Sequence, residues 1–281
     1  MSEVKISAAD VKKLRDATGS GMMDCKKALT ESGGDFDGAI EYLRLKGQKM
    51  AGKRADRDAK EGVVIAQVTD NGDTGIVMRL GCETDFVAKN EDFINMAKEF
   101  ATIALTSAPA DAAALNELPY KDGLTIAKKI EEYTGVIGEK IEISKYEILK
   151  ADGGQVVPYI HMGYRAGVIV AMNKPDADYT DAGKDVAMQI AAMRPLALDK
   201  DQVDPSVVEK EIEIGKELAR QEGKPEAMIE KIAMGKLNKF YKENTLLNQA
   251  FVKDSKQTVV SYLQSKDKDL TITAFKHIEL G

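Results

Sequence analysis

The spacing of apolar residues changes from helical to strand-like along the chain. Up to about residue 46 it fits three short amphipathic helices, and the third shows the i, i+3, i+4, i+7 pattern most clearly. Ser7, followed three residues later by Asp10, is typical of a capping box that opens the first helix. Asp35 can cap the third helix, and Gly47 is expected to end it. We therefore predict a three-helix bundle over residues 1–46.

Residues 47–61 are polar and rich in Lys, Arg, Asp and Gly. This composition is typical of a solvated, partly helical linker, and a contact with an acidic partner surface is the alternative. Because the bundle carries its own helix caps, we expect few contacts to cross this boundary.

Strand patterns begin at Gly62. Two apolar runs, residues 63–68 and 76–80, flank the turn sequence Asp-Asn-Gly-Asp and predict a β-hairpin. A helix with a single apolar face follows from about Asn90, and a second helical pattern runs near residues 124–133.

The same plan then repeats. Residues 141–143 alternate as in a strand, residues 156–161 and 167–171 predict a second hairpin, and a helical stripe begins at Val186 and ends before Pro195. We interpret this as an internal duplication: two α+β subdomains, residues 62–140 and 141–281, each a small antiparallel sheet covered by helices.

A charged helical stretch at residues 204–243 is interrupted once, at Gly223-Lys224-Pro225. Asp204 followed by Pro205 is a typical helix start. We predict an antiparallel helical hairpin that projects from the second subdomain, and a final strand over residues 270–278. Apolar and small residues are expected to line the two arms of the helical hairpin: Val208, Ile212, Gly215, Leu218 and Ala219 on the first, and Met228, Ile232 and Gly235 on the second.

Composition excludes several classes of protein. A net charge of −6 argues against a general nucleic-acid binder, which is normally basic. No apolar run approaches the roughly 20 residues of a membrane span, and the first residues lack the apolar core of a signal peptide. Cys25 and Cys82 lie in different segments without a Cys-x-x-Cys pattern, so we expect a reduced, cytoplasmic chain.

Catalytic signatures are missing from the sequence. His161 and His277 lie on separate predicted strands with no cysteine or acidic cluster beside them, and Gly19-Ser20-Gly21 is too short for a phosphate-binding loop. We therefore expect a binding protein rather than an enzyme, without a metal or cofactor.

The segment Gly81–Asn90 joins a predicted strand to a predicted helix and carries Asp85 and Phe86 in a short polar turn. Such a turn usually lies at the surface. A phenylalanine there is either a hydrophobic staple folded onto the next helix or an anchor for a partner, and the spacing alone leaves both open.

Four segments resemble the elongation factor Ts family, in the family's order. Thr84–Lys89 is similar to its central motif, and Leu14–Leu29 to its first signature. Val186–Ala192 and Lys239–Gln249 are similar to later segments. Two positions depart from the family pattern: Arg79-Leu80-Gly81 stands where Glu-x-Asn is usual, and Ala250 where Pro is usual.

The resemblance implies a factor that binds elongation factor Tu in its GDP-bound and nucleotide-free forms and promotes the release of GDP from it. It implies that Phe86 is a wedge in a turn shaped by Thr84, Asp85 and Val87, and that this turn disturbs the Mg²⁺ site of the partner. It further implies secondary partner contacts at Met22, Met23, Lys26 and His161. The alternatives are core packing for the two methionines and a structural role for the histidine.

The bundle also resembles the ubiquitin-associated type, and this leaves a second function open, an adaptor for helices or ribosome components. A homodimer is also left open. Some family members continue beyond the position of Gly281 into a further helix that grips the partner, and we expect that module to be absent here.

Overall fold

The computed structural model describes residues 5–281. Three helices form the predicted bundle: α1 (Ala8–Thr18), α2 (Met22–Glu31) and α3 (Phe36–Arg54). The capping box of Ser7 and Asp10 and the Asp35 cap are confirmed. The buried core of the bundle consists of Val11, Leu14, Cys25, Ala28, Leu29 and Ala39.

The prediction that Gly47 ends the third helix is wrong, because α3 continues to Arg54. Gly47 is buried where α3 crosses α7 (Ile126–Ile137), and a Cβ atom there would lie 2.7 Å from the carbonyl oxygen of Glu131. The glycine thus permits a close helix crossing rather than a helix end. The expectation of few contacts across the boundary is also wrong, since α3 packs extensively on α7.

The first sheet contains β1 (Glu61–Val68), β2 (Thr74–Cys82) and β3 (Glu142–Lys150), all antiparallel in that order. The predicted boundary at residue 140 had placed the last of these strands in the second subdomain. Its pairing with β2 corrects that assignment, and we propose to divide the core between β3 and β4 instead. Several helices accompany this sheet: α4 (Asp85–Ala88), α5 (Glu91–Ser107), α6 (Ala112–Asn116), η1 (Lys121–Gly123) and α7.

The second sheet pairs β4 (Gln155–Ile160) and β8 (Ile272–Glu279) with the central strand β5 (Ala166–Met172). The predicted hairpin and the predicted last strand are both confirmed. The helix α8 (Thr180–Met193) packs on this sheet. The other elements of this half are η2 (Met162–Tyr164), η3 (Ala177–Tyr179), η4 (Lys200–Gln202), η5 (Leu246–Asn248), β6 (Ala250–Phe251), β7 (Asp254–Thr258) and α11 (Val259–Lys266).

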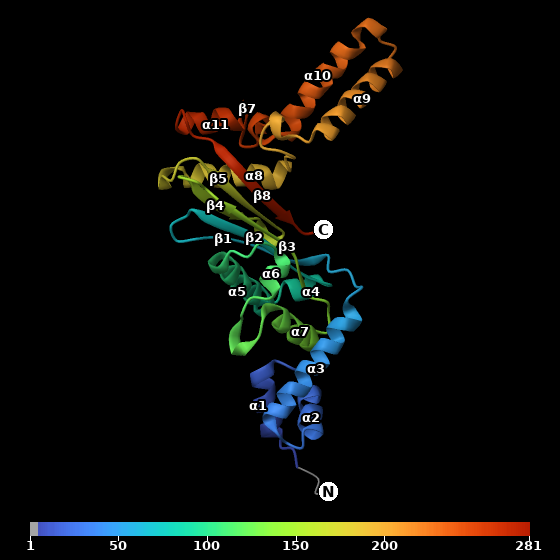
Figure 1. Ribbon diagram of the computed structural model, residues 1–281, viewed down its shortest axis with the longest axis vertical. Helices are drawn as coiled ribbons and strands as arrows, with labels where there is room; N and C mark the ends of the chain where they lie inside the picture. Colours follow the sequence, from blue (N-terminus) through green and yellow to red (C-terminus); the bar gives the residue numbers. More distant parts are fainter. Residues whose placement is uncertain (1–4) are drawn as a thin grey trace.

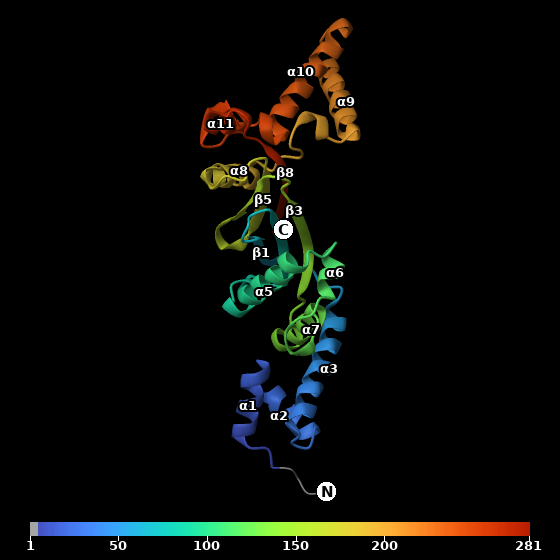
Figure 2. The same cartoon turned by 60° about the vertical axis from the view of Figure 1, so that its left-hand side comes forward.

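The two sheets pack against each other through an apolar layer. Alternate residues of each strand face this layer, for example Val64 and Val77 from the first sheet and Ile169 from the second. The intervening residues face the helices: Val63, Ile65 and Met78 contact the cluster of α5, and Val168 and Val170 contact that of α8. Figure 2 shows α5 and α8 on opposite sides of the paired sheets. The fold is α+β.

The helical hairpin is formed by α9 (Pro205–Gln221) and α10 (Glu226–Asn244). On α9 the small residues Gly215 and Ala219 are buried, as predicted, but Leu218, expected on the same face, is exposed. On α10 the prediction is wrong for Met228 and Gly235, which are exposed. The buried positions there are Ile229, Ala233 and Leu237.

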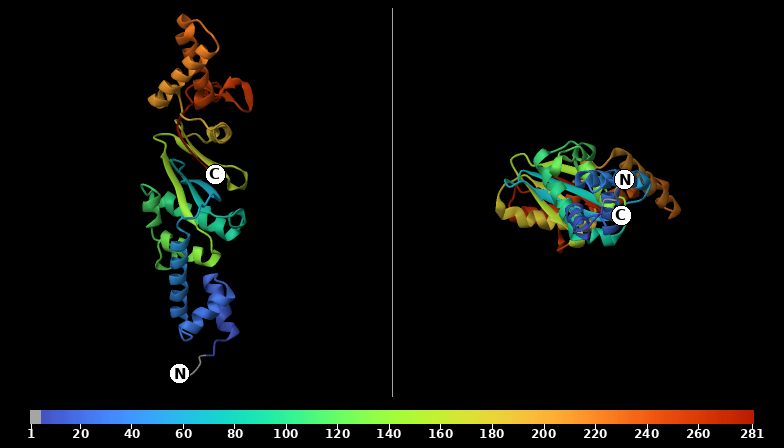
Figure 3. Two further views of the ribbon diagram at one scale, coloured as in Figure 1. Left: turned by 90° about the vertical axis from the view of Figure 1, so that its right-hand side faces the viewer. Right: turned by 90° about the horizontal axis from the view of Figure 1, so that it is seen from below.

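The bundle lies at one end of an elongated molecule, the sheets in the middle and the helical hairpin at the other end (Figure 1). The left view of Figure 3 shows that the molecule is long and narrow, with the C-terminus near the middle of its long axis. The sites inferred from sequence are therefore spread along this axis.

Candidate functional site

The Asp-Phe turn forms the single-turn helix α4 at the exit of β2. Thr84 is its N-cap, and Val87 and Ala88 pack against the first hydrophobic core. Phe86 points away from that core, with 82% of its surface exposed. The staple alternative is wrong, because a staple would be covered by the following helix. An exposed phenylalanine on an ordered turn instead has the properties of an anchor for a partner.

The carboxylate of Glu139 supports this turn from the loop after α7. Its Oε2 accepts a hydrogen bond from the Thr84 backbone N–H at 3.0 Å, and its Oε1 accepts one from the Thr84 hydroxyl at 2.7 Å. Sequence reasoning missed this residue. It lies 55 positions after Thr84, and no local pattern connects the two.

A second carboxylate, Glu83, connects the turn to α3. Both of its oxygens accept from Nη1 of Arg54, at 3.1 and 2.9 Å, and Oε1 also accepts from the Lys140 N–H at 2.7 Å. Arg54 is the last residue of the helix that begins in the bundle. The turn is thus tied to the ends of α3 and α7.

Asp85 carries its charge at the surface. Its Oδ2 lies 2.6 Å from Nζ of Lys89, one helical turn along. Hydrogen bonding to Lys89 lowers the pKa of Asp85, so the carboxylate is ionised at neutral pH. The turn therefore presents a paired carboxylate beside the exposed ring of Phe86.

The unusual residues before the turn have a structural role. Arg79 is buried and donates from Nη2 to the carbonyl oxygens of Ala59 and Lys60, each at 2.7 Å. A Cβ atom on Gly81 would lie 3.0 Å from the Ala59 oxygen. The segment before β1 therefore packs directly along β2, and little space is left for a side chain at position 81.

Met22, Met23 and Lys26 lie on the outer face of α2. The methionines are 58% and 76% exposed, so the core-packing alternative is wrong for both. Together with Ile6, Ser7, Ala8 and Val11, these three residues line an open groove of about 330 Å³. This groove is apolar at its base and has a cation at its edge.

His161 lies in the connection between β4 and β5, where its side chain is exposed and Nδ1 is 3.0 Å from the Tyr159 hydroxyl. Its neighbour Met162 is 86% exposed. Sequence reasoning missed Met162. The available signal was the placement of an apolar residue beside Gly163 in a predicted hairpin turn.

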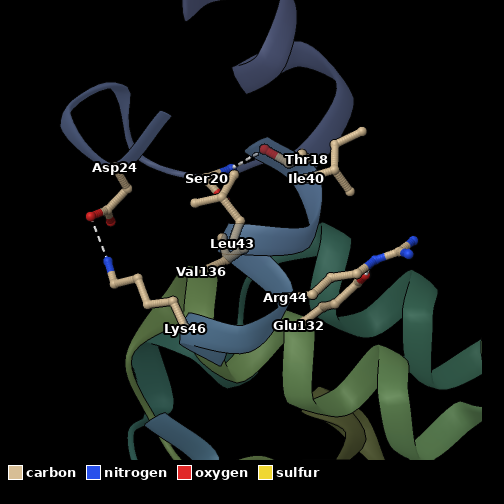
Figure 4. Close-up of a pocket in the computed structure, with 10 residues that line it drawn as sticks. Thr18, Ser20, Asp24, Ile40, Leu43, Arg44, Lys46, Glu132 and Val136 are labelled. Atoms are coloured by element: carbon tan, nitrogen blue, oxygen red, sulfur yellow. Dashed lines mark hydrogen bonds and ion pairs between the residues drawn. The ribbon is translucent and has the colours of Figure 1, made fainter. Parts of the chain in front are cut away.

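The junction of α3 with α7 fixes the bundle against the rest of the chain. Nε of Arg44 on α3 lies 2.7 Å from Oε1 of Glu132 on α7 (Figure 4). Within the bundle, Nζ of Lys46 on α3 lies 2.5 Å from Oδ1 of Asp24 on α2. The cavity between these helices has a volume of only about 30 Å³. Since this is space for about one water molecule, the junction is closely packed.

Residues 5–281 do not contain a metal cluster or a membrane-spanning helix. No group of three or more His, Cys, Asp or Glu side chains in that range is placed to hold a metal ion. None of the helices in that range is long and apolar enough to cross a membrane. Cys25 and Cys82 are free and buried.

Comparison with known proteins agrees with the sequence resemblance. The sequence model of the family Elongation factor TS matches residues 83–281, more than half of the chain. Proteins called elongation factor Ts from Cytophaga hutchinsonii and Christiangramia forsetii are 54% and 52% identical to it. These matches span 98% and 99% of this chain, and 99% of each relative. The protein of that name from Thermobifida fusca is 45% identical over 98% of both chains. The chain belongs to the elongation factor Ts family.

Proposed function

We propose that this protein accelerates the release of GDP from elongation factor Tu, acting in the cytoplasm without a cofactor. The observation that carries this proposal is Phe86, which is 82% exposed although the start of its turn is hydrogen-bonded, through Thr84 and Glu83, to the segment after α7. A turn whose backbone is already ordered loses little backbone entropy when it docks.

In the proposed mechanism, Phe86 inserts between helices of the nucleotide-binding domain of the partner, and Thr84, Asp85 and Val87 give the turn its shape. The insertion displaces the groups that hold Mg²⁺. Because Mg²⁺ is a strong local positive charge beside the diphosphate, its displacement weakens GDP binding. The protein then binds the nucleotide-free partner, and incoming nucleotide releases it, since the coupling between two ligands is reciprocal.

The proposal also includes a secondary attachment through Met22, Met23 and Lys26, with His161 as a further contact. The groove on α2 is exposed and apolar, which suits a helix of a partner. Two attachments on one rigid chain act at a high effective concentration for each other.

Stopped-flow release of fluorescent GDP from elongation factor Tu tests the proposal. We expect the release rate to rise with the concentration of this protein and to reach a plateau. An unchanged rate at saturating protein would overturn the proposal. The protein without its partner, incubated with GTP, serves as the control for hydrolysis.

A further inference from the structure

We propose that Glu139 is a positioning residue for nucleotide exchange, because it holds the Asp-Phe turn in its docking conformation through Thr84. This inference rests on the proposed function but adds a residue that does not touch the partner. It assigns the orientation of the Thr84 cap to a carboxylate outside the motif.

The hydrogen bonds of Thr84 show how this works. Its N–H and its hydroxyl both donate to Glu139, while the hydroxyl oxygen accepts from the Val87 N–H at 3.5 Å. The Thr84 carbonyl accepts from the Ala88 N–H at 3.2 Å. The N–H, the hydroxyl and the carbonyl of Thr84 are therefore all hydrogen-bonded, and the two bonds to Glu139 orient the residue. A helix of one turn is too short to be stable without such outside support.

Glu139 is itself held by rigid neighbours. Gly138 ends α7 in the left-handed conformation at a φ of 79°, and the Lys140 N–H donates to Glu83. Within residues 5–281, no cationic group lies within 4.0 Å of the Glu139 carboxylate, so its charge is directed at Thr84. Charge-assisted hydrogen bonds of this kind are about twice as strong as neutral ones.

The test compares three variants. Glu139→Ala removes both bonds, and Glu139→Gln keeps a neutral partner for Thr84. Glu131→Gln is the matched control, since it removes a charge from the same part of the chain. Among residues 5–281, the Glu131 carboxylate pairs only with Lys128, at 2.9 Å. Each variant is first checked by thermal melting, so that Glu139→Gln can carry the test if Glu139→Ala does not fold.

The first measurement is amide hydrogen exchange at Val87, Ala88 and Lys89 in the free protein. We expect faster exchange at these amides in Glu139→Ala, an intermediate effect in Glu139→Gln, and none in Glu131→Gln. Unchanged protection in both Glu139 variants would overturn the inference. This result does not depend on any activity.

The second measurement is GDP release from elongation factor Tu in two backgrounds. Glu139→Ala is expected to lower the maximal release rate about tenfold, which corresponds to the loss of charged hydrogen bonds. In a Phe86→Ala background the same change should have almost no further effect, because Glu139 acts through the turn. A merely structural role would reduce the rate by the same factor in both backgrounds, and this would overturn the inference. If the unmodified protein failed to release GDP from elongation factor Tu, the proposed function would be overturned instead. The amide hydrogen exchange of the turn would still decide whether Glu139 holds it.

Discussion

Gly47 of α3 and Gly135 of α7 lie back to back, so that a Cβ atom on Gly135 would stand 2.5 Å from the Cα of Gly47. Real Cβ atoms do not approach another backbone so closely, and both positions therefore require glycine. The contact lets two helices cross with their backbones almost touching. It makes the bundle a rigid extension of the core rather than a tethered module.

Gly47→Ala is expected to destabilise the protein by about 1–3 kcal/mol, as overpacking of a close contact usually does. Gly52→Ala is the matched control. Gly52 lies on the same helix, and apart from its chain neighbours and the adjacent helix backbone no atom of residues 5–281 lies within 4 Å of its added Cβ. This change should therefore be neutral or stabilising by up to about 1 kcal/mol. Denaturant unfolding measures both, and equal effects would contradict the packing described for Gly47.

Phe86→Ala should reduce GDP release strongly while leaving the melting temperature almost unchanged. Phe86 is mostly exposed, so truncation removes little buried surface, whereas an interface anchor can contribute about 2 kcal/mol or more to binding. Both quantities are measured on the same preparation. A lower melting temperature with a proportionate loss of activity would show that the ring has a structural role.

Met23→Ala is expected to weaken the complex with elongation factor Tu by about 1 kcal/mol or more if the groove on α2 holds part of the partner. Met228→Ala is its control, because Met228 is an exposed methionine on α10 at the far end of the molecule. Isothermal titration compares the two variants. Equal affinities would mean that the groove serves another partner, and the adaptor function would then gain support.

Cys82 should resist alkylation in the folded protein at pH 9. Burial, followed by the nearby charge of Glu139, raises the pKa of this thiol to about 12, so the reactive thiolate is suppressed. Unfolding releases the proton, and the stabilisation from the neutral thiol is lost as the pH rises above the unfolded pKa. Mass spectrometry of iodoacetamide-treated protein, native and in denaturant, should show modification of Cys82 only in denaturant.

Asp267→Asn should destabilise the protein near neutral pH but not near pH 2. The Asp267 carboxylate accepts from Lys174 at 2.6 Å and from the Tyr179 hydroxyl at 2.7 Å. Hydrogen bonding to Lys174 first, then to the Asp269 N–H and Tyr179, lowers the pKa of Asp267 to about 2. The stabilisation is present above the unfolded pKa and disappears as the pH falls toward the folded value. Melting of the variant and of Asp269→Asn between pH 2 and 7 should show this dependence only for the former.

Local patterns were sufficient to predict the helix caps, the two hairpins and the paired helices α9 and α10. Two of the errors share one cause, which is a contact between segments distant in sequence. Gly47 looks like a helix end unless the backbone of α7 is known to pass beside it. Residues 142–150 look like the start of a second unit unless their pairing with β2 is known.

In the candidate site, too, local patterns predicted some features, whereas contacts between distant segments were missed. The surface position of the turn with Asp85 and Phe86 could be inferred from its place between a strand and a helix, but whether Phe86 is a staple or an exposed anchor could not. Glu139 could not, because its contact with Thr84 depends on where the end of α7 lies in space. Met228 and Gly235 were predicted on the inner face of α10 but lie outside its buried stripe, since small and apolar residues occur on both neighbouring faces of that helix.

Because α3 runs without a break from the bundle to the core, its helical rotation determines the direction in which the groove on α2 faces. Each residue of an α-helix adds about 100° of rotation and 1.5 Å of length. One alanine inserted after Leu45 would therefore turn the groove by more than a quarter of a circle relative to Phe86, while every side chain at both surfaces stayed the same. The number of residues in α3 before Gly47 thus fixes the angle about the helix axis between the groove on α2 and Phe86. A partner that contacts both surfaces must fit this angle.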